Sequence, residues 1–310
     1  MVGWRVLIRT GQRLPDALAD LRCWTAGRLV SAVLPDQPAL PWRENSAGGV
    51  EGERSWTALW HFRELIGYFA LRDLKLRYRQ AFLGVVWVLA QPIASVAVFT
   101  LVFSKLAGIS SEGVPYPVFA LVGLITWTYF SSVVVAGSGA LVLNASLVTK
   151  VYFPRMAAPA AALLPPAVDL AISMVLFGGV AAYYGVFSGL RLLAVPLWLL
   201  LLVVTALGPA LWLSALNVRY RDVQHAVAPV LQVWLFVSPV AYPATLLSGW
   251  QELVYAVNPV VGVIQLGRWC LLGTPWPGWS LLVSSVSTVV LLLGGLAYFS
   301  RAQRSFADVI

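Results

Sequence analysis

The sequence predicts an all-α polytopic membrane protein with six transmembrane helices. Hydrophobic residues make up 59% of the 310 residues and charged residues only 11%, and the mean hydropathy is +0.80. A typical soluble domain has about 25% charged residues. Several apolar runs reach the roughly 20 residues that a helix needs to cross a bilayer core. None of them shows the short alternating segments of a transmembrane β-barrel, and a helix satisfies its own backbone groups in lipid.

Six apolar runs have the length of a membrane span. They cover residues 81–104, 118–143, 157–187, 192–216, 224–246 and 279–300. One set of connecting loops holds twelve basic residues: Arg54, Arg63, Arg72, Lys75, Arg77, Arg79, Lys150, Arg155, Arg219, Arg221, Arg301 and Arg304. The opposite set holds three: Lys105, Arg191 and Arg268. Because basic loops stay in the cytoplasm, both termini are expected there. The net charge of +8 is therefore a topological signal, and no basic soluble domain indicates nucleic-acid binding.

The chain ahead of the first span divides into two parts, and the spans form a third. Residues 1–53 are expected to be a cytoplasmic extension that ends in a Pro- and Gly-rich linker, and they receive no function. Three arginines interrupt the apolar residues at the start of the chain, so a cleavable signal peptide is not expected. Residues 54–80 are expected to form an amphipathic helix at the cytoplasmic interface, and residues 81–310 the transmembrane domain.

The amphipathic helix is predicted from polar residues at three- and four-residue steps. This polar stripe consists of Thr57, His61, Glu64, Tyr68, Arg72, Lys75 and Arg79. Asp73 falls on the apolar side and breaks the pattern. A helix of this kind suits the headgroup boundary, and a plain anchor is the simpler interpretation. Arg77 and Arg79 are either positive-inside residues or contacts for an anionic headgroup, because guanidinium groups bind phosphate oxygens in pairs.

A short basic stretch, LVTKVYFPR, interrupts the apolar chain at residues 147–155, between the second and third spans. Two helical turns can precede its proline, which ends them. The resulting tip would consist of Lys150, Tyr152, Phe153, Pro154 and Arg155. A short rigid knob with an apolar tip and basic sides could dock into a cleft of a partner protein. An ordinary basic loop explains the same residues.

The region before the last span is apolar but is broken repeatedly by proline and glycine. Such a segment does not form one continuous crossing. We expect two short re-entrant helices on the outer side, around residues 248–257 and 260–271. Irregular backbone at that depth is tolerated only where protein or water surrounds it. We therefore predict that these helices form an ordered structure at the outer end of the transmembrane domain.

Two sets of residues within the spans have open interpretations. The aromatic residues Trp87, Trp127, Tyr129, Phe130, Trp234 and Phe236 could pack against other helices or could line a path for carbohydrate, because flat rings pack on the C–H faces of sugars. Asp169 is the only acid well inside a span. Ionisable residues at such depth are costly and are typical of functional sites, although a satisfied structural acid fits equally well.

Three kinds of chemistry have no residues to support them. No lysine follows a glycine, so no phosphate-binding Walker loop is present. The two histidines have no metal-ligand spacing, and no carboxylate pair is placed for acid–base work on a sugar. We therefore expect no catalytic residues, no bound metal and no cofactor in this chain.

Six segments together resemble the membrane-spanning subunit of polysaccharide ABC exporters, the type-2 permeases that move O-antigens, teichoic acids and capsular glycans. They are residues 74–92, 121–132, 147–163, 215–223, 238–243 and 258–268, and they follow one another in the order of that family. The resemblance spans about residues 55–310, and the first 53 residues fall outside it.

The resemblance implies a half-transporter in the plasma membrane that forms a homodimer. Each copy would bind a separate cytosolic ATPase, which would carry the ATP and Mg²⁺. The two copies would form a channel for an undecaprenyl-diphosphate-linked glycan. The stretch around residues 146–155 would match the gate or coupling helix that touches the ATPase. Arg77, Arg79 and Lys150 would contact the lipid pyrophosphate, and the six aromatic residues would line the sugar path.

Two other functions are compatible with parts of the sequence. A related permease could export small lipids or drugs, but short outer loops argue against it. A membrane-embedded glycosyl or acyl transferase belongs to a different class, and the missing acid pairs, histidines and metal spacing argue against it.

Overall fold

The structure is a computed structural model that describes residues 62–79, 84–145, 154–244, 249–303 and 306. All these residues lie within one compact unit, Gly52–Ile310. Every regular element among the described residues is helical, which confirms the all-α prediction. The N-terminal extension and the first residues of the expected amphipathic helix lie outside the described residues, so the predicted division of the N-terminal region stays a prediction.

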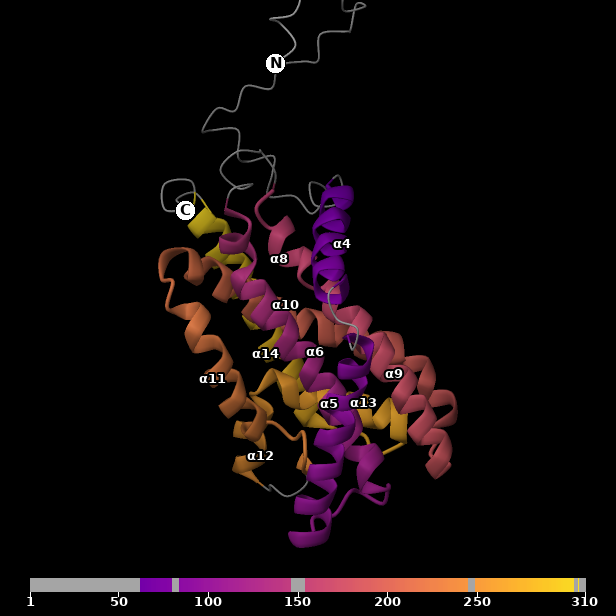
Figure 1. Cartoon of the computed structure of the whole chain (residues 1–310). Helices are drawn as coiled ribbons and strands as arrows, with labels where there is room; N and C mark the ends of the chain where they lie inside the picture. Colours follow the sequence, from indigo (N-terminus) through magenta and orange to yellow (C-terminus); the bar gives the residue numbers. More distant parts are fainter. Residues whose placement is uncertain (1–61, 80–83, 146–153, 245–248, 304–305, 307–310) are drawn as a thin grey trace, which may run out of the picture. The chain divides into compact units, whose positions relative to one another are not determined.

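The helices follow one another along the chain with short connections (Figure 1). They are α4 (Arg63–Arg79), α5 (Gly84–Phe99), η2 (Thr100–Leu106), α6 (Tyr116–Leu143), α8 (Ala157–Ala161), α9 (Leu164–Tyr184), η3 (Gly189–Ala194), α10 (Val195–Arg219), α11 (Val223–Val237), α12 (Trp250–Ala256), α13 (Pro259–Leu272) and α14 (Trp279–Ala302). Proline in the first turn of α6, α9 and α10 fits positions where the backbone N–H has no helical partner.

Five segments are long and apolar enough to cross a membrane: Val86–Leu106, Tyr116–Leu143, Ala157–Tyr184, Gly189–Arg219 and Trp279–Ala302. They correspond to five of the six expected spans. The remaining one, expected at 224–246, contains α11, whose 15 residues reach only about 22 Å. The backbone becomes extended at Ser238, directly before Pro239, which cannot continue a helix. The count of six spans therefore stays a prediction.

The two short helices expected before the last span are present as α12 and α13. Asn258 begins α13 by accepting a hydrogen bond from the backbone N–H of Val260 at 3.1 Å. Gly273 ends it in the left-handed conformation, with φ of 75°, where an L-residue would be strained. Their existence and bounds agree with the sequence, and their re-entry into the membrane stays a prediction.

Helix α6 is the centre of the fold, because α5, α9, α10, α11 and α13 all pack against it. Small residues allow the closest contacts. A Cβ atom added to Gly137 of α6 would lie 2.7 Å from the Cβ of Ala210 in α10. A Cβ added to Gly295 of α14 would lie 2.8 Å from the carbonyl oxygen of Gly208 in α10. Association of helices in lipid depends on such close packing, so these glycines bring α6, α10 and α14 together.

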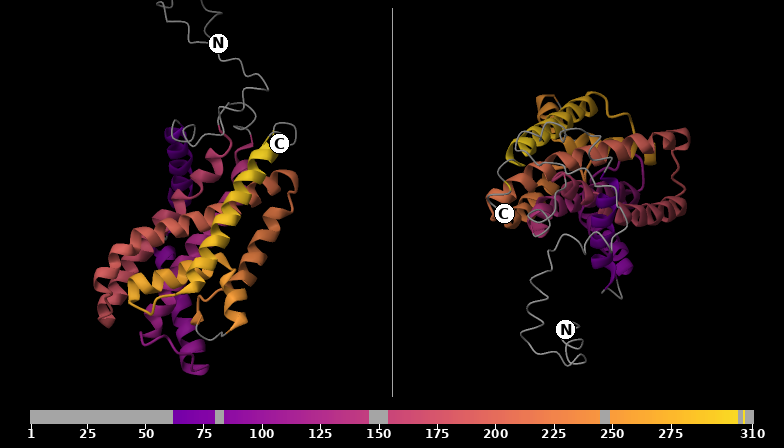
Figure 2. Two further views of the ribbon diagram at one scale, coloured as in Figure 1. Left: turned by 180° about the vertical axis from the view of Figure 1, so that it is seen from behind. Right: turned by 90° about the horizontal axis from the view of Figure 1, so that it is seen from above.

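Helices α4 and α8 lie together at one end of α6, near the C-terminal end of α14, in both side views (Figures 1 and 2). Phe69 of α4 is buried against Ala157 and Ala161 of α8. The opposite end of α6 is Tyr116, whose hydroxyl donates to the carbonyl of Ala241 at 2.6 Å. The 28 residues of α6 separate these two ends by about 42 Å.

Candidate functional site

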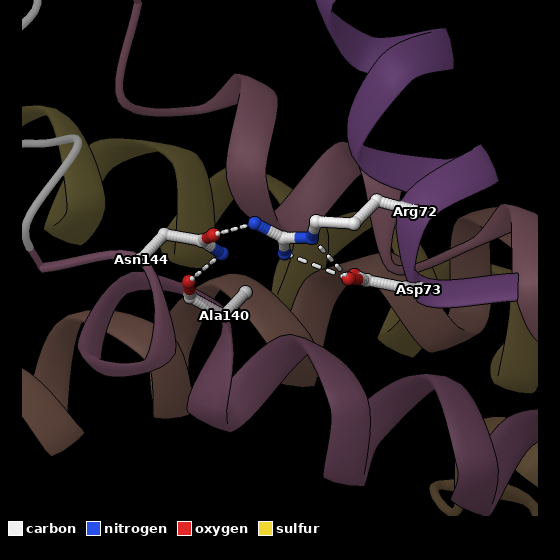
Figure 3. Close-up of polar contacts among 4 residues, drawn as sticks. All are labelled: Arg72, Asp73, Ala140 and Asn144. Atoms are coloured by element: carbon white, nitrogen blue, oxygen red, sulfur yellow. Dashed lines mark hydrogen bonds and ion pairs between the residues drawn. The ribbon is translucent and has the colours of Figure 1, made fainter. Parts of the chain in front are cut away.

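The C-terminal half of α4 is fixed to α6 through Arg72 (Figure 3). The Nη1 of Arg72 donates to the Oδ1 of Asn144 at 2.7 Å. Its Nε and Nη2 donate to the Oδ1 of Asp73 at 2.9 and 2.7 Å. Asn144 is the C-cap of α6, and its Nδ2 donates to the carbonyl of Ala140 at 2.7 Å. One continuous chain of hydrogen bonds therefore runs from α4 into the last turn of α6.

Asp73 has a place in this arrangement that the periodic pattern did not reveal. Its carboxylate lies beside the guanidinium of Arg72 and fixes its direction, as Figure 3 shows. Phe69, one turn earlier in α4, has its ring centre 5.4 Å from the carbon of the same guanidinium. Asp73, which breaks the polar stripe, is thus the counter-ion of Arg72, whose side chain points toward the protein.

A second contact fixes the end of α4 to α9. The Nη2 of Arg77 lies 2.7 Å from the Oδ2 of Asp169, and the hydroxyl of Tyr78 donates to the other oxygen of that carboxylate. The side chain of Asp169 is only 11% exposed, whereas that of Arg77 is 44% exposed. A buried carboxylate needs a cation or several donors, and α4 supplies both. The acid that the sequence indicated inside a span is therefore paired.

The electrostatics at this contact favour a protonated Tyr78. Burial, followed by the hydrogen bond to Asp169 and the charge of its carboxylate, raises the pKa of Tyr78 to about 12, although Arg77 opposes the shift. The phenol consequently remains a hydrogen-bond donor to Asp169 throughout the physiological range. The sequence pattern gave no signal for Tyr78 beside Arg77, because the residues of a helix that share a face are three or four apart.

The predicted coupling stretch is described only from Pro154 onward. Pro154 is buried, and the Nη1 of Arg155 donates to the backbone carbonyl of Gln303, just after α14. The guanidinium carbon of Arg155 also lies 5.9 Å from the centre of the Phe306 ring. Lys150, Tyr152 and Phe153 lie outside the described residues. Arg155 is thus in contact with the C-terminal end of the chain.

The predicted lipid contacts differ in what the structure says of them. Arg77 pairs with Asp169 and keeps an exposed side. Arg79 is the last residue of α4, and its side chain is not among those described, nor is Lys150. The structure therefore places one of the three predicted contacts, and it places that one at the junction of α4 and α9.

The six aromatic candidates fall into two groups. Trp127, Tyr129 and Phe130 are buried in the core around α6. Trp234 of α11 packs edge-on against Phe130, with 5.2 Å between the ring centres, and its indole N–H donates to Asn258 at 3.0 Å. Trp87 of α5 and Phe236 of α11 are instead 66% and 64% exposed. Of these six residues, the last two present their rings outward from the chain.

The opposite end of α6 contains a buried polar cluster that the sequence did not predict. Arg268 of α13 is only 2% exposed. Its Nη2 and Nη1 donate to the carbonyls of Val240 and Tyr242 at 2.8 and 3.3 Å, and its guanidinium carbon lies 3.5 Å from the centre of the Phe119 ring. In the sequence it counted only as an outer basic residue. Its position within an apolar helix was a signal for such a buried role.

Glu112, in the loop before α6, is the acid whose charge acts on this arginine. Burial raises the pKa of Glu112 from its ordinary value, and the positive charge of Arg268 opposes that rise. The hydrogen bonds of the arginine go instead to the two backbone carbonyls. The irregular segment at 238–243 is therefore held by an arginine that replaces the hydrogen bonds a helix would have supplied.

The chain is similar in sequence to several curated transport proteins. The O-antigen export system permease protein RfbA of Myxococcus xanthus is 29% identical over 256 residues, which cover 81% of this chain and 97% of that protein. A protein of the same name from Klebsiella pneumoniae is 21% identical over 80% of this chain and 95% of its own length. The polysialic acid transport protein KpsM of Escherichia coli is 26% identical over 76% of this chain and 92% of its own length.

A family profile covers most of the described structure. Residues 64–272 match the family described as ABC-2 type transporter. The match runs from the start of α4 to the end of α13, so it includes both contacts of α4 and the buried cluster around Arg268. Because it covers more than half of the chain, and because the apolar helices are those of a multi-pass membrane protein, this chain belongs to the ABC-2 type transporter family.

Proposed function

We propose that this chain is the permease subunit of an exporter that moves a polysaccharide across the plasma membrane. The observation that carries the proposal is the similarity to permeases named for O-antigen export and polysialic acid transport, which extends over nearly the full length of those proteins. The family match supports a transport subunit driven by an ABC ATPase. The glycan would cross while linked to undecaprenyl diphosphate.

The assembly we propose has two copies of this chain and two copies of a cytosolic ATPase, which bind ATP and Mg²⁺. Six spans would leave both termini in the cytoplasm. In that arrangement α11 and the segment up to Ala244 together make the fifth crossing, and α12 and α13 form the re-entrant pair at the outer side. The excess of basic residues in one set of loops supports this orientation.

The lipid pyrophosphate is proposed to bind at the end of α4. Arg77 supports this, because Asp169 holds one edge of its guanidinium while the side chain remains 44% exposed. A guanidinium group has five N–H donors, so an anion can be bound at the open edge while the ion pair persists. Arg79 and Lys150 are proposed as further contacts from their charge and their place in the sequence.

Coupling to the ATPase is proposed at residues 150–155. Arg155 joins the end of this stretch to Gln303, just after α14, and Pro154 beside it is buried. Lys150, Tyr152 and Phe153 are proposed to make the contact with the partner. Arg155 also has a contact within the chain, so its replacement would disturb more than docking. Docking is therefore tested by a substitution at Phe153.

The sugar path is proposed to use the exposed rings of Trp87 and Phe236. These two rings lie on α5 and α11, which both pack against α6. The buried rings of Trp127, Tyr129 and Phe130 instead belong to the core around α6. A single exposed ring at each position would support the sliding of a carbohydrate chain, because stacking on C–H surfaces is not directional.

The test is transport by the reconstituted complex. The chain is co-purified with the ATPase encoded beside its gene and placed in vesicles, and ATP-dependent movement of an undecaprenyl-diphosphate-linked glycan is measured. The same glycan without lipid and undecaprenyl phosphate without glycan serve as comparisons. Transport of the lipid-linked glycan alone supports the proposal. ATP-dependent transport of a small lipid or a drug, without any movement of the glycan, would contradict the proposal.

Two variants locate the roles within the complex. Phe153→Asp is expected to weaken assembly with the ATPase, whereas Arg77→Ala is expected to leave assembly intact and to raise the concentration of lipid-linked glycan needed for half-maximal ATP turnover. Lys75→Ala, which removes a positive charge from an exposed site on α4, is the control. If Arg77→Ala and Lys75→Ala behave alike, the pyrophosphate contact is not at Arg77.

A further inference from the structure

The contact between Arg72 and Asn144 joins α4 to the most buried of the long apolar helices. Asn144 is 5% exposed, and both polar atoms of its side-chain amide are used. Its Oδ1 accepts from Arg72 at 2.7 Å, and its Nδ2 donates to the carbonyl of Ala140 at 2.7 Å. A buried amide with both ends satisfied has one stable orientation, so the position of Arg72 is defined relative to the backbone of α6.

The electrostatics of the helix end strengthen this contact. The last carbonyls of a helix carry a partial negative charge, which attracts a cation. The guanidinium of Arg72 reaches the C-terminal end of α6 through Asn144, and Asp73 neutralises its other edge. A hydrogen bond with a charged donor is stronger than a neutral one and is sensitive to direction. The contact is therefore specific for a guanidinium at this position.

Helix α4 has a second contact, with α9, in addition to the contact between Arg72 and Asn144. Five residues after Arg72, the side chain of Arg77 pairs with Asp169 on α9. The helix is thus tied to α6 by one arginine and to α9 by the next. Helix α5 begins four residues after the end of α4, and the two helices contact each other, so a displacement of α4 can reach the start of the first span.

We propose that Arg72 is a positioning residue of the transport cycle, which fixes α4 to the end of α6 through Asn144 so that the two move as one body and pass the ATP-driven displacement to α5. This inference rests on the proposed function only for the source of the displacement. Loss of the contact would leave ATP hydrolysis in place and would separate it from movement of the substrate.

The first experiment measures ATP turnover and glycan transported per ATP in the reconstituted complex. Arg72→Ala and Asn144→Ala are expected to keep basal turnover within about twofold and to lower transport per ATP by roughly tenfold, the factor that corresponds to one charge-assisted hydrogen bond. Asn144→Asp keeps an acceptor for Arg72 but loses the donor to the carbonyl of Ala140, and it is expected to restore part of the coupling. Lys75→Ala removes the same charge from α4 and is expected to change neither quantity.

The outcomes separate a positioning role from a structural one. If both alanine variants lower the melting temperature but transport the normal amount of glycan per ATP, the contact only stabilises the fold and the inference is wrong. The inference is equally wrong if only one of the two alanine variants lowers transport per ATP, because each of them removes the same hydrogen bond.

A second measurement does not depend on the substrate. Leu76 of α4 and Leu143 of α6 are both exposed. Each is replaced by cysteine in a Cys23→Ser background and carries a spin label. The two labels report the distance between the two helices. We expect one narrow distance distribution with and without ATP, and a broad distribution with ATP once Asn144 is replaced by alanine. A distance that changes with ATP while the contact is unaltered would overturn the inference even if no glycan were transported.

Discussion

The two ends of α6 hold its neighbours by different means. At the α4 end, Arg72 binds the neutral amide of Asn144 and the adjacent Asp73, and Arg77 binds the carboxylate of Asp169. The two arginines keep a third to nearly a half of their side chains exposed. At the opposite end, Arg268 is 2% exposed and donates to two backbone carbonyls. Both ends use arginine, but only the first leaves it partly in contact with the surroundings.

This difference has mechanical meaning. An exposed ion pair is worth little by itself and can exchange partners, because water or another anion takes over the contact. A buried arginine has no such substitute, since its removal leaves carbonyls without donors. The ion pair of Arg77 with Asp169 is therefore suited to a contact that rearranges during a cycle, whereas the buried Asn144 keeps Arg72 in place. The Arg268 end is suited to holding an irregular segment in one conformation.

The largest effect is expected at Arg268. Replacement by leucine leaves the carbonyls of Val240 and Tyr242 without donors at about 1–3 kcal/mol each, so we expect a loss of about 4 kcal/mol in stability. Thermal unfolding in detergent measures it. Arg268→Lys keeps one donor and should lose about half as much. A leucine variant as stable as the natural chain would show that the arginine does not hold the 238–243 segment.

The next effect is steric and concerns the same end. A Cβ added to Gly123 of α6 would overlap the carbonyl oxygen of Val240 and lie 3.0 Å from the Nη2 of Arg268. Gly123→Ala is therefore expected to destabilise by about 2 kcal/mol, as overpacking does. The matched control is Gly178→Ala in α9, where a Cβ meets nothing within 4 Å. Equal unfolding temperatures for the two variants would contradict the close packing at Gly123.

The helices were easier to predict from the sequence than the contacts between them. Apolar length and proline positions are local properties, and they located the first four spans, α12, α13 and α14. They did not indicate that α11 ends at Val237, because the hydropathy of residues 238–246 does not reveal that the backbone leaves the helix at Ser238. A helix end that tertiary hydrogen bonds satisfy has no local signature.

The site was predictable where charge and membrane conflict. Asp169 was singled out because an acid in a span needs a partner, and that partner is Arg77. The sequence could not connect these two residues, which lie on different helices far apart in the chain. It left Arg77 as either a positive-inside residue or a contact for an anionic headgroup. Asn144 was not predicted to belong to the site, because an asparagine near a helix end usually makes local hydrogen bonds to the backbone. It belongs to the site because Arg72 donates a hydrogen bond to it.

The α4 end is expected to respond asymmetrically to loss of either partner of the ion pair. Arg77→Met leaves the buried carboxylate of Asp169 with Tyr78 alone, and we expect a loss of about 2 kcal/mol after allowing for the exposure of the arginine. Asp169→Asn leaves only a half-exposed cation and should lose about 1 kcal/mol or less. Unfolding of both variants in parallel checks this order, and a reversed order would place the buried charge on Arg77.

The smallest effect is expected at Tyr78, and it depends on pH only in the alkaline range. Its folded pKa of about 12 lies above the ordinary value of 10.0, so the protonated phenol is favoured in the fold. The stabilisation is fully present below pH 10 and is lost as the pH rises from 10 toward 12. The difference in stability between the natural chain and Tyr78→Phe should therefore be constant up to pH 10 and then shrink. Because other groups titrate equally in both proteins, this difference reports the raised pKa of Tyr78, to which burial contributes most and the hydrogen bond to Asp169 next. A difference that stays constant to pH 12 would show that the pKa of the phenol is not raised in the fold.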